Sequence, residues 1–352
     1  MSTSITTLMQ AQAASPFPMN RWWVAGFSRE LADRPLARTF LGRRVVLFRT
    51  PDGAVSALED RCCHKELPLS CGAVEEHGLR CGYHGLLFDA QGRCIEIPGQ
   101  AHIPPKARVR SYPLVEQDKI LWIWISEDPE AVPADAPPRY PVHDDPRYRY
   151  GGDSFHYNAP YQLIHDNLLD LSHLGYVHTR TIGGNPRLHM NAEVRTTGDE
   201  ASVRVVRWMP DSEPPPTYSA AWPFKGRIDR WQEVVFHPSH CEIWTGAMDA
   251  GVGALDDPQR EGFHMRGFHG VTPETETTAH YLWTIATNPH PDKQDVTKLV
   301  VDQTAATFEE DKLIIEAQWD NQKNFATRKQ VDIHVDAGPN RARRIIERLR
   351  SA

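Results

Sequence analysis

A proline-rich run at residues 126–146 constrains the fold more than any other feature of the chain. Six prolines fall in these 21 positions. Proline has a fixed φ and no amide hydrogen to donate, so this density excludes a helix or a central strand and predicts a semi-rigid connector. In a chain of 352 residues the connector predicts two domains, at residues 19–125 and 147–352, preceded by a flexible tail at residues 1–18.

The residues before the connector predict a small antiparallel β domain. An apolar run at residues 45–48 is followed by a turn signal at 50–53 and a second run at 54–58. The last run, ILWIWI, is rich in isoleucine and tryptophan. Strand-sized runs separated by glycine, proline and aspartate are typical of hairpins.

Beyond the connector the pattern predicts an α+β domain. In residues 161–174 leucine and isoleucine recur at intervals close to 3.6 residues, which predicts a helix. Residues 190–290 return to strand-sized runs, and residues 295–322 and 340–349 predict a long helix and a basic end helix. A curved antiparallel sheet with helices packed against it accommodates this order.

Composition excludes several classes of protein. With 39 Lys and Arg against 46 Asp and Glu, the net charge is −7, and no long run of one sign favours nucleic acid. No apolar run reaches the roughly 18 residues of a membrane span. The first residues lack the basic and apolar regions of a secretory signal, so we expect a cytoplasmic protein. Five of the six cysteines lie between Cys62 and Cys94, which in a reducing compartment predicts metal binding rather than disulfides.

Two cysteines and two histidines in that cluster have the spacing of a metal site. Cys62-x-His64 and Cys81-x-x-His84 are separated by sixteen residues. Such a set can hold a structural zinc ion, or a Rieske [2Fe–2S] cluster in which two thiolates bind one iron and two imidazoles the other. The order of the pairs, with one glycine inside the second pair and another directly after it, favours the iron–sulfur cluster.

A second metal site is predicted on the helix after the connector. Asn167, Asp170 and His173 are three residues apart and share one face. His173 and His178 would lie about 140° apart on a regular helix, so a break near Gly175 is needed to bring both imidazoles to one metal. Two histidines need a carboxylate to complete a facial triad for Fe(II).

That carboxylate is expected on the long helix, where FEEDKLIIEAQW offers Glu309, Glu310, Asp311 and Glu316. Spacing favours Asp311 modestly, because it belongs to a predicted inward stripe whose other members are Thr307, Ile314 and Gln318. Glu309 and Glu310 are predicted to point into solvent.

In this order the motifs resemble the terminal oxygenase components of Rieske non-heme iron oxygenases. C-x-H…C-x-x-H, N-x-x-D-x-x-H-x-x-x-x-H and a distant helical aspartate cover nearly the whole chain. The segments CCHKELPLSCG, CGYHGLLFD, IEIPGQ and TPETETTAHY are similar to the subgroup of vanillate O-demethylase, toluenesulfonate methyl-monooxygenase and dicamba O-demethylase. The resemblance implies a Rieske domain at residues 19–125 and, at residues 147–352, a mononuclear iron catalytic domain with a helix-grip fold.

The resemblance also implies roles for the motif residues. Cluster ligands would be Cys62, His64, Cys81 and His84, and the Fe(II) ligands His173, His178 and Asp311. Asp170 would carry electrons from His84 of a neighbouring subunit to His173 within a head-to-tail homotrimer, and Asn167 would line the iron site.

Electrons must come from outside the chain, because it offers no convincing dinucleotide-binding fingerprint. The segment GAMDAGVGALDD lacks the strand–glycine–helix context that such a site needs. We therefore expect a separate NAD(P)H-dependent flavin reductase, with a ferredoxin centre of its own.

The resemblance implies a small aromatic carboxylate or sulfonate as substrate, whose acid group needs charge-assisted donors in an apolar pocket. Candidate donors on predicted strands are His269, Arg204, Arg207, Arg230 and Arg266, although an exposed strand charge explains each arginine more simply. Candidate stacking residues are Trp283 and Phe268, which are equally good core residues.

The sequence leaves the reaction itself open. Ring dihydroxylation, hydroxylation of a methyl group and O-demethylation depend on which carbon faces the iron. A non-enzymatic iron–sulfur electron carrier, or a zinc-stabilised binding protein, is the alternative from another class and would have no second metal.

Overall fold

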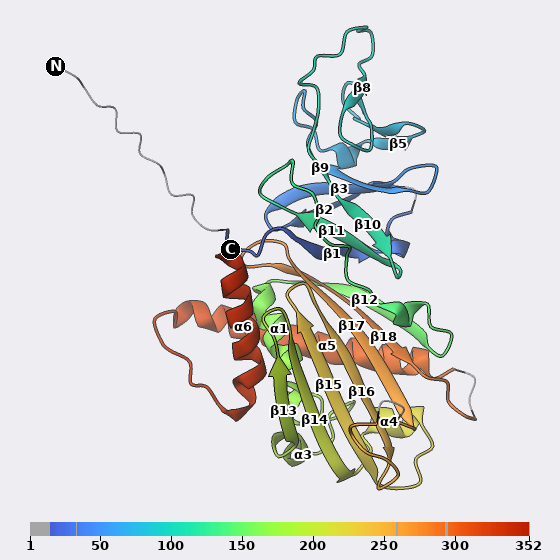
Figure 1. The fold of residues 1–352 in the computed structure, drawn as a ribbon, viewed down its shortest axis with the longest axis vertical. Helices are drawn as coiled ribbons and strands as arrows, with labels where there is room; N and C mark the ends of the chain where they lie inside the picture. The colour runs from blue at the N-terminus through green and yellow to red at the C-terminus, as the bar shows by residue number, and fades with distance from the viewer. Residues whose placement is uncertain (1–14, 33, 258–259, 293–294, 352) are drawn as a thin grey trace, which may run out of the picture.

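The computed structural model describes residues 15–32, 34–257, 260–292 and 295–351, which form an all-β part followed by an α+β part (Figure 1). The strands of the first part are β1 (Arg21–Phe27), β2 (Leu36–Phe40), β3 (Arg43–Arg49), β4 (Val55–Glu59), β5 (Ala73–Glu75), β6 (Gly78–Arg80), β7 (Leu87–Phe88), β8 (Cys94–Glu96), β9 (Ser111–Tyr112), β10 (Leu114–Gln117) and β11 (Ile120–Ile125). Those of the second part are β12 (Arg149–Tyr157), β13 (Glu193–Gly198), β14 (Val203–Ser212), β15 (Ile228–His237), β16 (His240–Asp249), β17 (Phe263–Pro273) and β18 (Ala279–Thr287). Its helices are α1 (Tyr161–Leu169), α2 (Leu174–Val177), α3 (Pro186–Met190), α4 (Pro216–Ala221), α5 (Thr297–Asn324) and α6 (Ala337–Arg350).

Small antiparallel sheets build the first part, in the strand orders β2-β3-β4-β9, β1-β11-β10 and β5-β6-β7-β8. The predicted hairpin is β3–β4, and at its turn the Thr50 N–H donates to the carbonyl of Ala54 while Gly53 has a φ of +91°. β11 lies between β1 and β10, and all its side chains are buried. The predicted all-β character of this part is confirmed.

The segment expected to be a flexible tail ends in a packed residue. Its first fourteen positions lie outside the described residues. Phe17 is 5% exposed and meets the ring of Tyr161 edge-on, with centroids 6.4 Å apart. The expectation of a free tail is therefore wrong for the end of this segment, which is anchored to α1.

The proline-rich connector is packed where it enters the second part. Tyr140 and His143 are both buried. Nδ1 of His143 lies 2.7 Å from the carbonyl oxygen of Asp118, and its Nε2 lies 2.8 Å from Oγ1 of Thr284. Because Asp118 precedes β11 and Thr284 belongs to β18, one connector side chain ties the two parts together.

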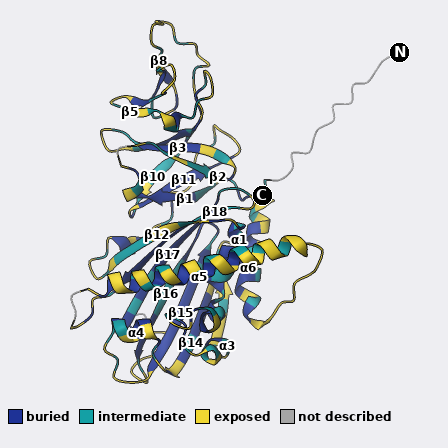
Figure 2. Cartoon of the chain, turned by 180° about the vertical axis from the view of Figure 1, so that it is seen from behind, coloured by how far each residue is buried: buried dark blue, intermediate teal, exposed yellow. Residues whose placement is uncertain are grey.

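A seven-stranded antiparallel sheet, in the order β12-β18-β17-β16-β15-β14-β13, forms the body of the second part. α5 lies across this sheet, and in Figure 2 its ribbon alternates between exposed and buried residues along its length. The side chains of α5 that are buried include Val300, Thr304, Phe308, Asp311 and Ile315. This sheet-and-helix arrangement confirms the predicted α+β class.

An apolar cluster joins the first part to the sheet of the second. Its buried members are Val24, Phe27, Ile120, Trp122, Tyr140, Phe268 and Leu282. The strands approach closely here: a Cβ on Gly270 would lie 2.8 Å from the side chain of Val24, and the hydroxyl of Thr272 donates to the Val24 carbonyl at 2.7 Å. Phe268, a candidate stacking residue, thus belongs to this cluster.

The helix predicted for residues 161–174 is interrupted at Asp170. α1 ends at Leu169, Asp170 is extended with φ −116° and ψ 90°, and a 3-10 turn at Leu171–His173 leads into α2. The Asp170 carboxylate accepts the N–H of Ser172 at 2.9 Å. Such a local side-chain bond competes with helix continuation. The break predicted at Gly175 is therefore wrong in position.

The long helix is close to its predicted bounds, but its inward stripe differs. Thr307 and Asp311 are buried as predicted, whereas Ile314 is 45% exposed and Gln318 is also exposed. Ile315 lies inside instead, because a step of four residues after Asp311 keeps closer to the buried face than a step of three.

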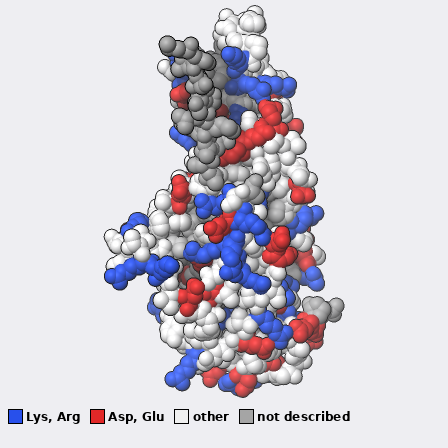
Figure 3. All heavy atoms as spheres, turned by 60° about the vertical axis from the view of Figure 1, so that its left-hand side comes forward, with Lys and Arg blue, Asp and Glu red and all other residues white. Residues whose placement is uncertain are grey.

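Among the described residues, no helix is both long and apolar enough to cross a membrane. On the face seen in Figure 3, basic side chains gather near the middle, and acidic side chains border and interrupt them.

We predict that Gly175→Ala destabilises the protein by about 1–3 kcal/mol. A Cβ on Gly175 would lie 2.4 Å from Cα of Pro186 and 2.9 Å from its nitrogen, which are backbone atoms of α3 and cannot rotate away. Thermal denaturation should show Tm lowered by roughly 2–10 °C. Gly226→Ala is the matched control, because nothing lies within 4 Å of the added Cβ; equal Tm values for the two variants would contradict the prediction.

Candidate functional site: two metal centres and an apolar pocket

Two loops of the same shape carry the predicted cluster ligands. Each begins with a cysteine, Cys62 or Cys81, whose N–H donates to the carbonyl five residues further on at 2.8 Å. In each loop the fifth residue, Glu66 or Gly85, has a positive φ and donates its N–H back to the carbonyl of that cysteine. The two loops therefore have matching backbone hydrogen bonds around their cysteines, whereas His64 is the third residue of its loop and His84 the fourth.

The cysteines of these loops are buried and the histidines are exposed. Cys62 and Cys81 are each 2% exposed, whereas His64 and His84 are open to solvent with ring centroids 4.6 Å apart. Exposed Tyr83 lies against the His84 ring, 3.9 Å between centroids. A metal held by the histidines would lie nearest to the surface.

The spread of the four donors fits an iron–sulfur cluster better than a single zinc ion. A tetrahedral zinc ion would hold all four within about 4 Å of one another, because its bonds are only about 2.0–2.3 Å long. Within the described part of the chain, no three of these four donor atoms lie within 4.8 Å of one another. Two separate pairs fit two metal ions, as in a Rieske cluster.

Packing fixes the glycine inside the second ligand pair. A Cβ on Gly82 would lie 2.8 Å from the carbonyl oxygen of Cys71, so glycine is required there. Burial raises the pKa of the Cys62 thiol to about 11, so a bound metal is what would keep it as the thiolate that ligates.

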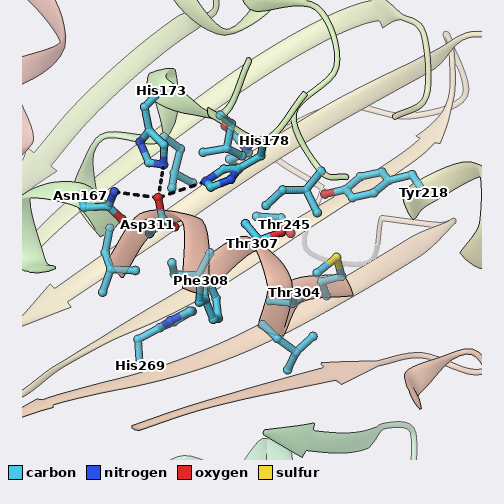
Figure 4. A pocket seen from close by; sticks show the side chains of 18 of the residues that line it. Asn167, His173, His178, Tyr218, Thr245, His269, Thr304, Thr307, Phe308 and Asp311 are labelled. Carbon is cyan, nitrogen blue, oxygen red and sulfur yellow. Dashed lines mark hydrogen bonds and ion pairs between the residues drawn. The ribbon is translucent and has the colours of Figure 1, made fainter. Parts of the chain in front are cut away.

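His173, His178 and Asp311 meet at the second predicted metal site (Figure 4). Oδ1 of Asp311 lies 3.1 Å from Nε2 of His178 and 3.4 Å from Nε2 of His173. The two imidazoles are nearly perpendicular, at 77°. All three donors lie within 4.8 Å of one another, so this set of two imidazoles and one carboxylate fits a single ion such as Fe(II).

Each imidazole is oriented through its other nitrogen. Nδ1 of His173 lies 2.6 Å from the main-chain carbonyl oxygen of Asp170, and Nδ1 of His178 lies 2.7 Å from Oε2 of Glu310. Such partners favour the tautomer whose Nε2 lone pair is free for a metal. The prediction that Glu310 points into solvent is therefore wrong, whereas Glu309 is exposed as predicted.

Asp311 is held as a carboxylate. Burial alone would raise its pKa, but the hydrogen bonds and charges of His173 and His178 outweigh burial and hold the pKa well below its usual range. Asn167 donates its side-chain N–H to the same oxygen at 3.1 Å. Glu316, another candidate, lies elsewhere, where it accepts the N–H of Asn158.

Asp170 is half-buried and lies with His173 in a depression that opens on the surface. Its main-chain carbonyl contacts His173, and its carboxylate caps the 3-10 turn at Ser172. The direct partner of the imidazole is thus the Asp170 backbone.

His237, His240 and Glu242 form another group whose donor atoms lie within 4.8 Å of one another. The rings of His237 and His240 are stacked, 18° from parallel and 4.7 Å apart. Lone pairs of ring nitrogens lie in the ring planes, so parallel stacked rings do not converge on one ion as the rings of His173 and His178 do.

A mostly apolar pocket, with a cavity volume of about 60 Å³, adjoins the His173–His178–Asp311 site between α5 and the sheet. Its apolar wall is formed mainly by Leu168, Leu171, Leu174, Ile182, Ile243, Met265, Ile285 and Phe308.

The candidate substrate contacts lie on opposite faces of the sheet. Arg266 lies on the opposite face of β17 from Met265 and His269, and stacks 3.7 Å above the Trp244 ring. Its predicted substrate role is therefore wrong. Arg204 pairs with Glu233 on the outside of the sheet.

The remaining candidates divide between the core and the pocket. Trp283 is fully buried behind Phe308, with ring centroids 5.0 Å apart, and does not line the pocket. Arg207 is buried against the carbonyl of His189, also away from the pocket lining. His269 and Arg230 both line it.

His269 is 2% exposed, and its Nδ1 lies 2.7 Å from the hydroxyl of Tyr281. Its Nε2 is buried without a hydrogen-bond partner, and burial lowers the pKa of the imidazole to about 3. It therefore faces the pocket as a neutral group with one nitrogen still to be satisfied.

Sequence reasoning missed three pocket or site residues. Glu310 was assigned to solvent, and neither Gln232 nor Thr304, which line the pocket, was singled out. Gln232 could have been identified because it is polar and lies an even number of positions from a pocket residue on the same strand. Alternate residues of a strand share a face.

Two protein families match the chain. The Rieske [2Fe-2S] domain matches residues 21–113, and the vanillate O-demethylase oxygenase C-terminal domain matches residues 157–352.

Relatives match over nearly the full length. A putative toluene-4-sulfonate monooxygenase system iron-sulfur subunit of Comamonas testosteroni is 40% identical, over 95% of this chain and 97% of that protein. A vanillate O-demethylase oxygenase subunit of a Pseudomonas species is 34% identical over 96% of each chain.

Solved structures agree with this relationship. Dicamba monooxygenase bound to 3,6-dichlorosalicylic acid matches with a TM-score of 0.87 and 30% identity, over 95% of this chain and 98% of that one. A structure of dicamba monooxygenase with non-heme iron and dicamba matches with a TM-score of 0.80. The chain therefore belongs to the Rieske non-heme iron oxygenases, as a terminal oxygenase component with a Rieske [2Fe–2S] cluster and a mononuclear iron.

Proposed function

We propose that the enzyme oxidises a small aromatic carboxylate or sulfonate at a carbon held beside an iron bound by His173, His178 and Asp311. The convergence of both Nε2 atoms on Oδ1 of Asp311, at 3.1 and 3.4 Å, carries this proposal. Fe(II) in such a site supplies activation of O2 when it receives electrons one at a time. Relatives named for toluene-4-sulfonate, vanillate and dicamba support an aromatic acid.

The side chains of the chain hold and enclose the substrate. The apolar wall excludes water and binds the ring, because burying aromatic surface is favourable. Nε2 of His269, buried and unpartnered, would be satisfied by a polar group of the substrate. Asn167 and Glu310 do not touch the substrate in this proposal but position Asp311 and His178.

Cys62, His64, Cys81 and His84 are the cluster ligands in this proposal, and one chain's cluster serves the iron of another. The loops that carry them lie at the far end of the molecule from the iron pocket (Figure 1). Exposed His84 and the surface depression that holds Asp170 and His173 are suited to meet across a subunit interface. We propose a head-to-tail homotrimer in which Asp170 links His84 of one subunit to His173 of the next.

The oxygenase works with a separate reductase that draws electrons from NAD(P)H. The relatives are oxygenase components or iron-sulfur subunits of multicomponent systems, and this chain lacks a convincing dinucleotide-binding motif. All six cysteines are free of disulfides, which supports a cytoplasmic location.

O-demethylation is the second candidate reaction. Relatives named as vanillate and dicamba O-demethylases favour it, and the same pocket can present a methoxy carbon, a methyl carbon or a ring carbon to the iron. Incubation of benzoates, phthalates, vanillate and toluenesulfonate with a surrogate reductase, followed by mass spectrometry, distinguishes these outcomes by the mass change of the product.

We predict about three irons and two acid-labile sulfides per chain in the purified protein. A [2Fe–2S] cluster accounts for two irons and both sulfides, and the His173–His178–Asp311 site for the third iron. Chemical assays of iron and sulfide measure this ratio. Two irons per chain that persist after Fe(II) is supplied would identify an electron carrier, and zinc without sulfide would identify a zinc-stabilised protein.

We predict that Asp170→Asn keeps both metal centres but lowers turnover about 10- to 100-fold, because a hydrogen bond to a charged group contributes roughly 1.5–3 kcal/mol. Metal content, the visible spectrum of the cluster and product formation are measured together. A variant that loses iron yet turns over normally would contradict the assigned role.

We predict that Glu310→Ala weakens iron binding about 10- to 100-fold, because the outer partner of a ligating histidine is removed. The loss of iron to a chelator, followed over time, measures the effect independently of activity. Glu309→Ala removes the same charge from the exposed neighbour and should retain iron like the unmodified protein. Equal iron loss from the two variants would show that Glu310 has no positioning role.

A further inference from the structure

The pocket has a polar end that the iron site does not use. In the antiparallel sheet Arg230 of β15 pairs with Ala247 of β16, which pairs with Phe263 of β17. His269 of β17 pairs with Cys241 of β16, which pairs with Phe236 of β15. Six residues of β15 therefore separate the level of Arg230 from that of His269, about 20 Å along the strand. Figure 4 shows Tyr218 and Thr304 on the side of the pocket away from His173 and Asp311.

Arg230 brings an uncompensated positive charge to this far end. Its residue is 4% exposed, and its guanidinium donates only to two main-chain carbonyls, those of Ile182 at 2.9 Å and Gly183 at 3.2 Å. Among the described residues, no carboxylate lies within the 4.0 Å of an ion pair with Arg230. A buried cation without a counter-ion is costly, and an anion bound beside it removes that cost.

The Nε donor of this guanidinium is still free. Its Nε is buried and has no hydrogen-bond partner, although Arg230 lines the pocket. The guanidinium lies over the ring of Tyr218, 4.8 Å from the centroid, which fixes its plane but does not neutralise it. The carbonyl contacts and the ring therefore hold the side chain in place for a ligand.

Two neighbours add unsatisfied donors to the same wall. Gln232, two residues along β15 on the same face, is fully buried, and both atoms of its amide lack partners. Thr304 of α5 is 1% exposed, and its hydroxyl also lacks a partner. Both residues line the pocket. A guanidinium, an amide and a hydroxyl suit a carboxylate or sulfonate, whose several oxygens accept at once.

We propose that Arg230, Gln232 and Thr304 bind the acid group of the substrate at the end of the pocket away from the iron. This inference rests on the proposed function and narrows the substrate class. The ring then spans the apolar wall, and the carbon that is oxidised lies across the ring from the acid, in the para position.

The test compares binding of toluene-4-sulfonate and toluene-2-sulfonate to the anaerobic, metal-loaded protein by calorimetry. We expect the 4-isomer to bind at least about tenfold more tightly than the 2-isomer. We expect Arg230→Met to weaken binding of the 4-isomer by at least about 30-fold, and to change binding of the uncharged 4-methylbenzenesulfonamide by less than about threefold. Arg266→Met removes a guanidinium from the opposite face of the sheet and should leave both affinities unchanged.

A second variant covers the case in which Arg230→Met fails to fold because the carbonyls of residues 182 and 183 lose their donors. Thr304→Val removes an unpartnered hydroxyl with little change of shape and should weaken sulfonate binding roughly tenfold. Equal or tighter binding of the 2-isomer, or unchanged affinity in Thr304→Val or a folded Arg230→Met, would overturn this inference. A protein with the full iron and sulfide content that oxidises aromatic substrates would still satisfy the proposed function after such a result.

Discussion

The convergence of two imidazoles and one carboxylate on a single point is the constraint on which the catalytic part depends. His173 and His178 lie at the two ends of one short helix, and Asp311 lies on a long helix more than a hundred residues later. Their donor atoms lie within 4.8 Å of one another, and the end of α1 before Asp170 takes His173 and His178 off the regular helix on which they would lie about 140° apart. Close packing of α2 on Pro186, which tolerates no Cβ at Gly175, holds α2 in place.

The hydrogen-bond partners of the two imidazoles determine where their Nε2 atoms point. A main-chain carbonyl holds one imidazole and the carboxylate of Glu310 holds the other, so both Nε2 atoms are free to face Asp311. Without these partners either nitrogen could carry the proton, and the lone pairs would not be aimed. Asp170 thus has two roles, because it ends α1 and its main-chain carbonyl also orients His173.

The two metal centres differ in how they relate to solvent. In the first part the thiols are buried and the imidazoles are exposed, so exchange of electrons is easiest through the histidines. In the second part the predicted ligands line a pocket whose wall is formed mainly by apolar side chains of the sheet and of the helices, α5 included. That pocket concentrates buried polar atoms without partners at Arg230, Gln232, His269 and Thr304. Buried polar atoms are usually paired, and a bound acid group would supply the missing partners of Arg230, Gln232 and Thr304 in the proposal made above.

The sequence by itself determined the fold class and the family, because cysteines and histidines at exact spacings and the hydrophobic periodicity are local features of the chain. It could not determine where α1 breaks, since a side-chain hydrogen bond at Asp170 outcompetes a helical pattern that continues to residue 174. Only the tertiary structure decided that Glu310 supports His178, that Arg230 faces the pocket and that Arg266 faces away. The physical reason is that packing of the sheet against α5 decides which face of each strand points into the pocket and which side of α5 is buried.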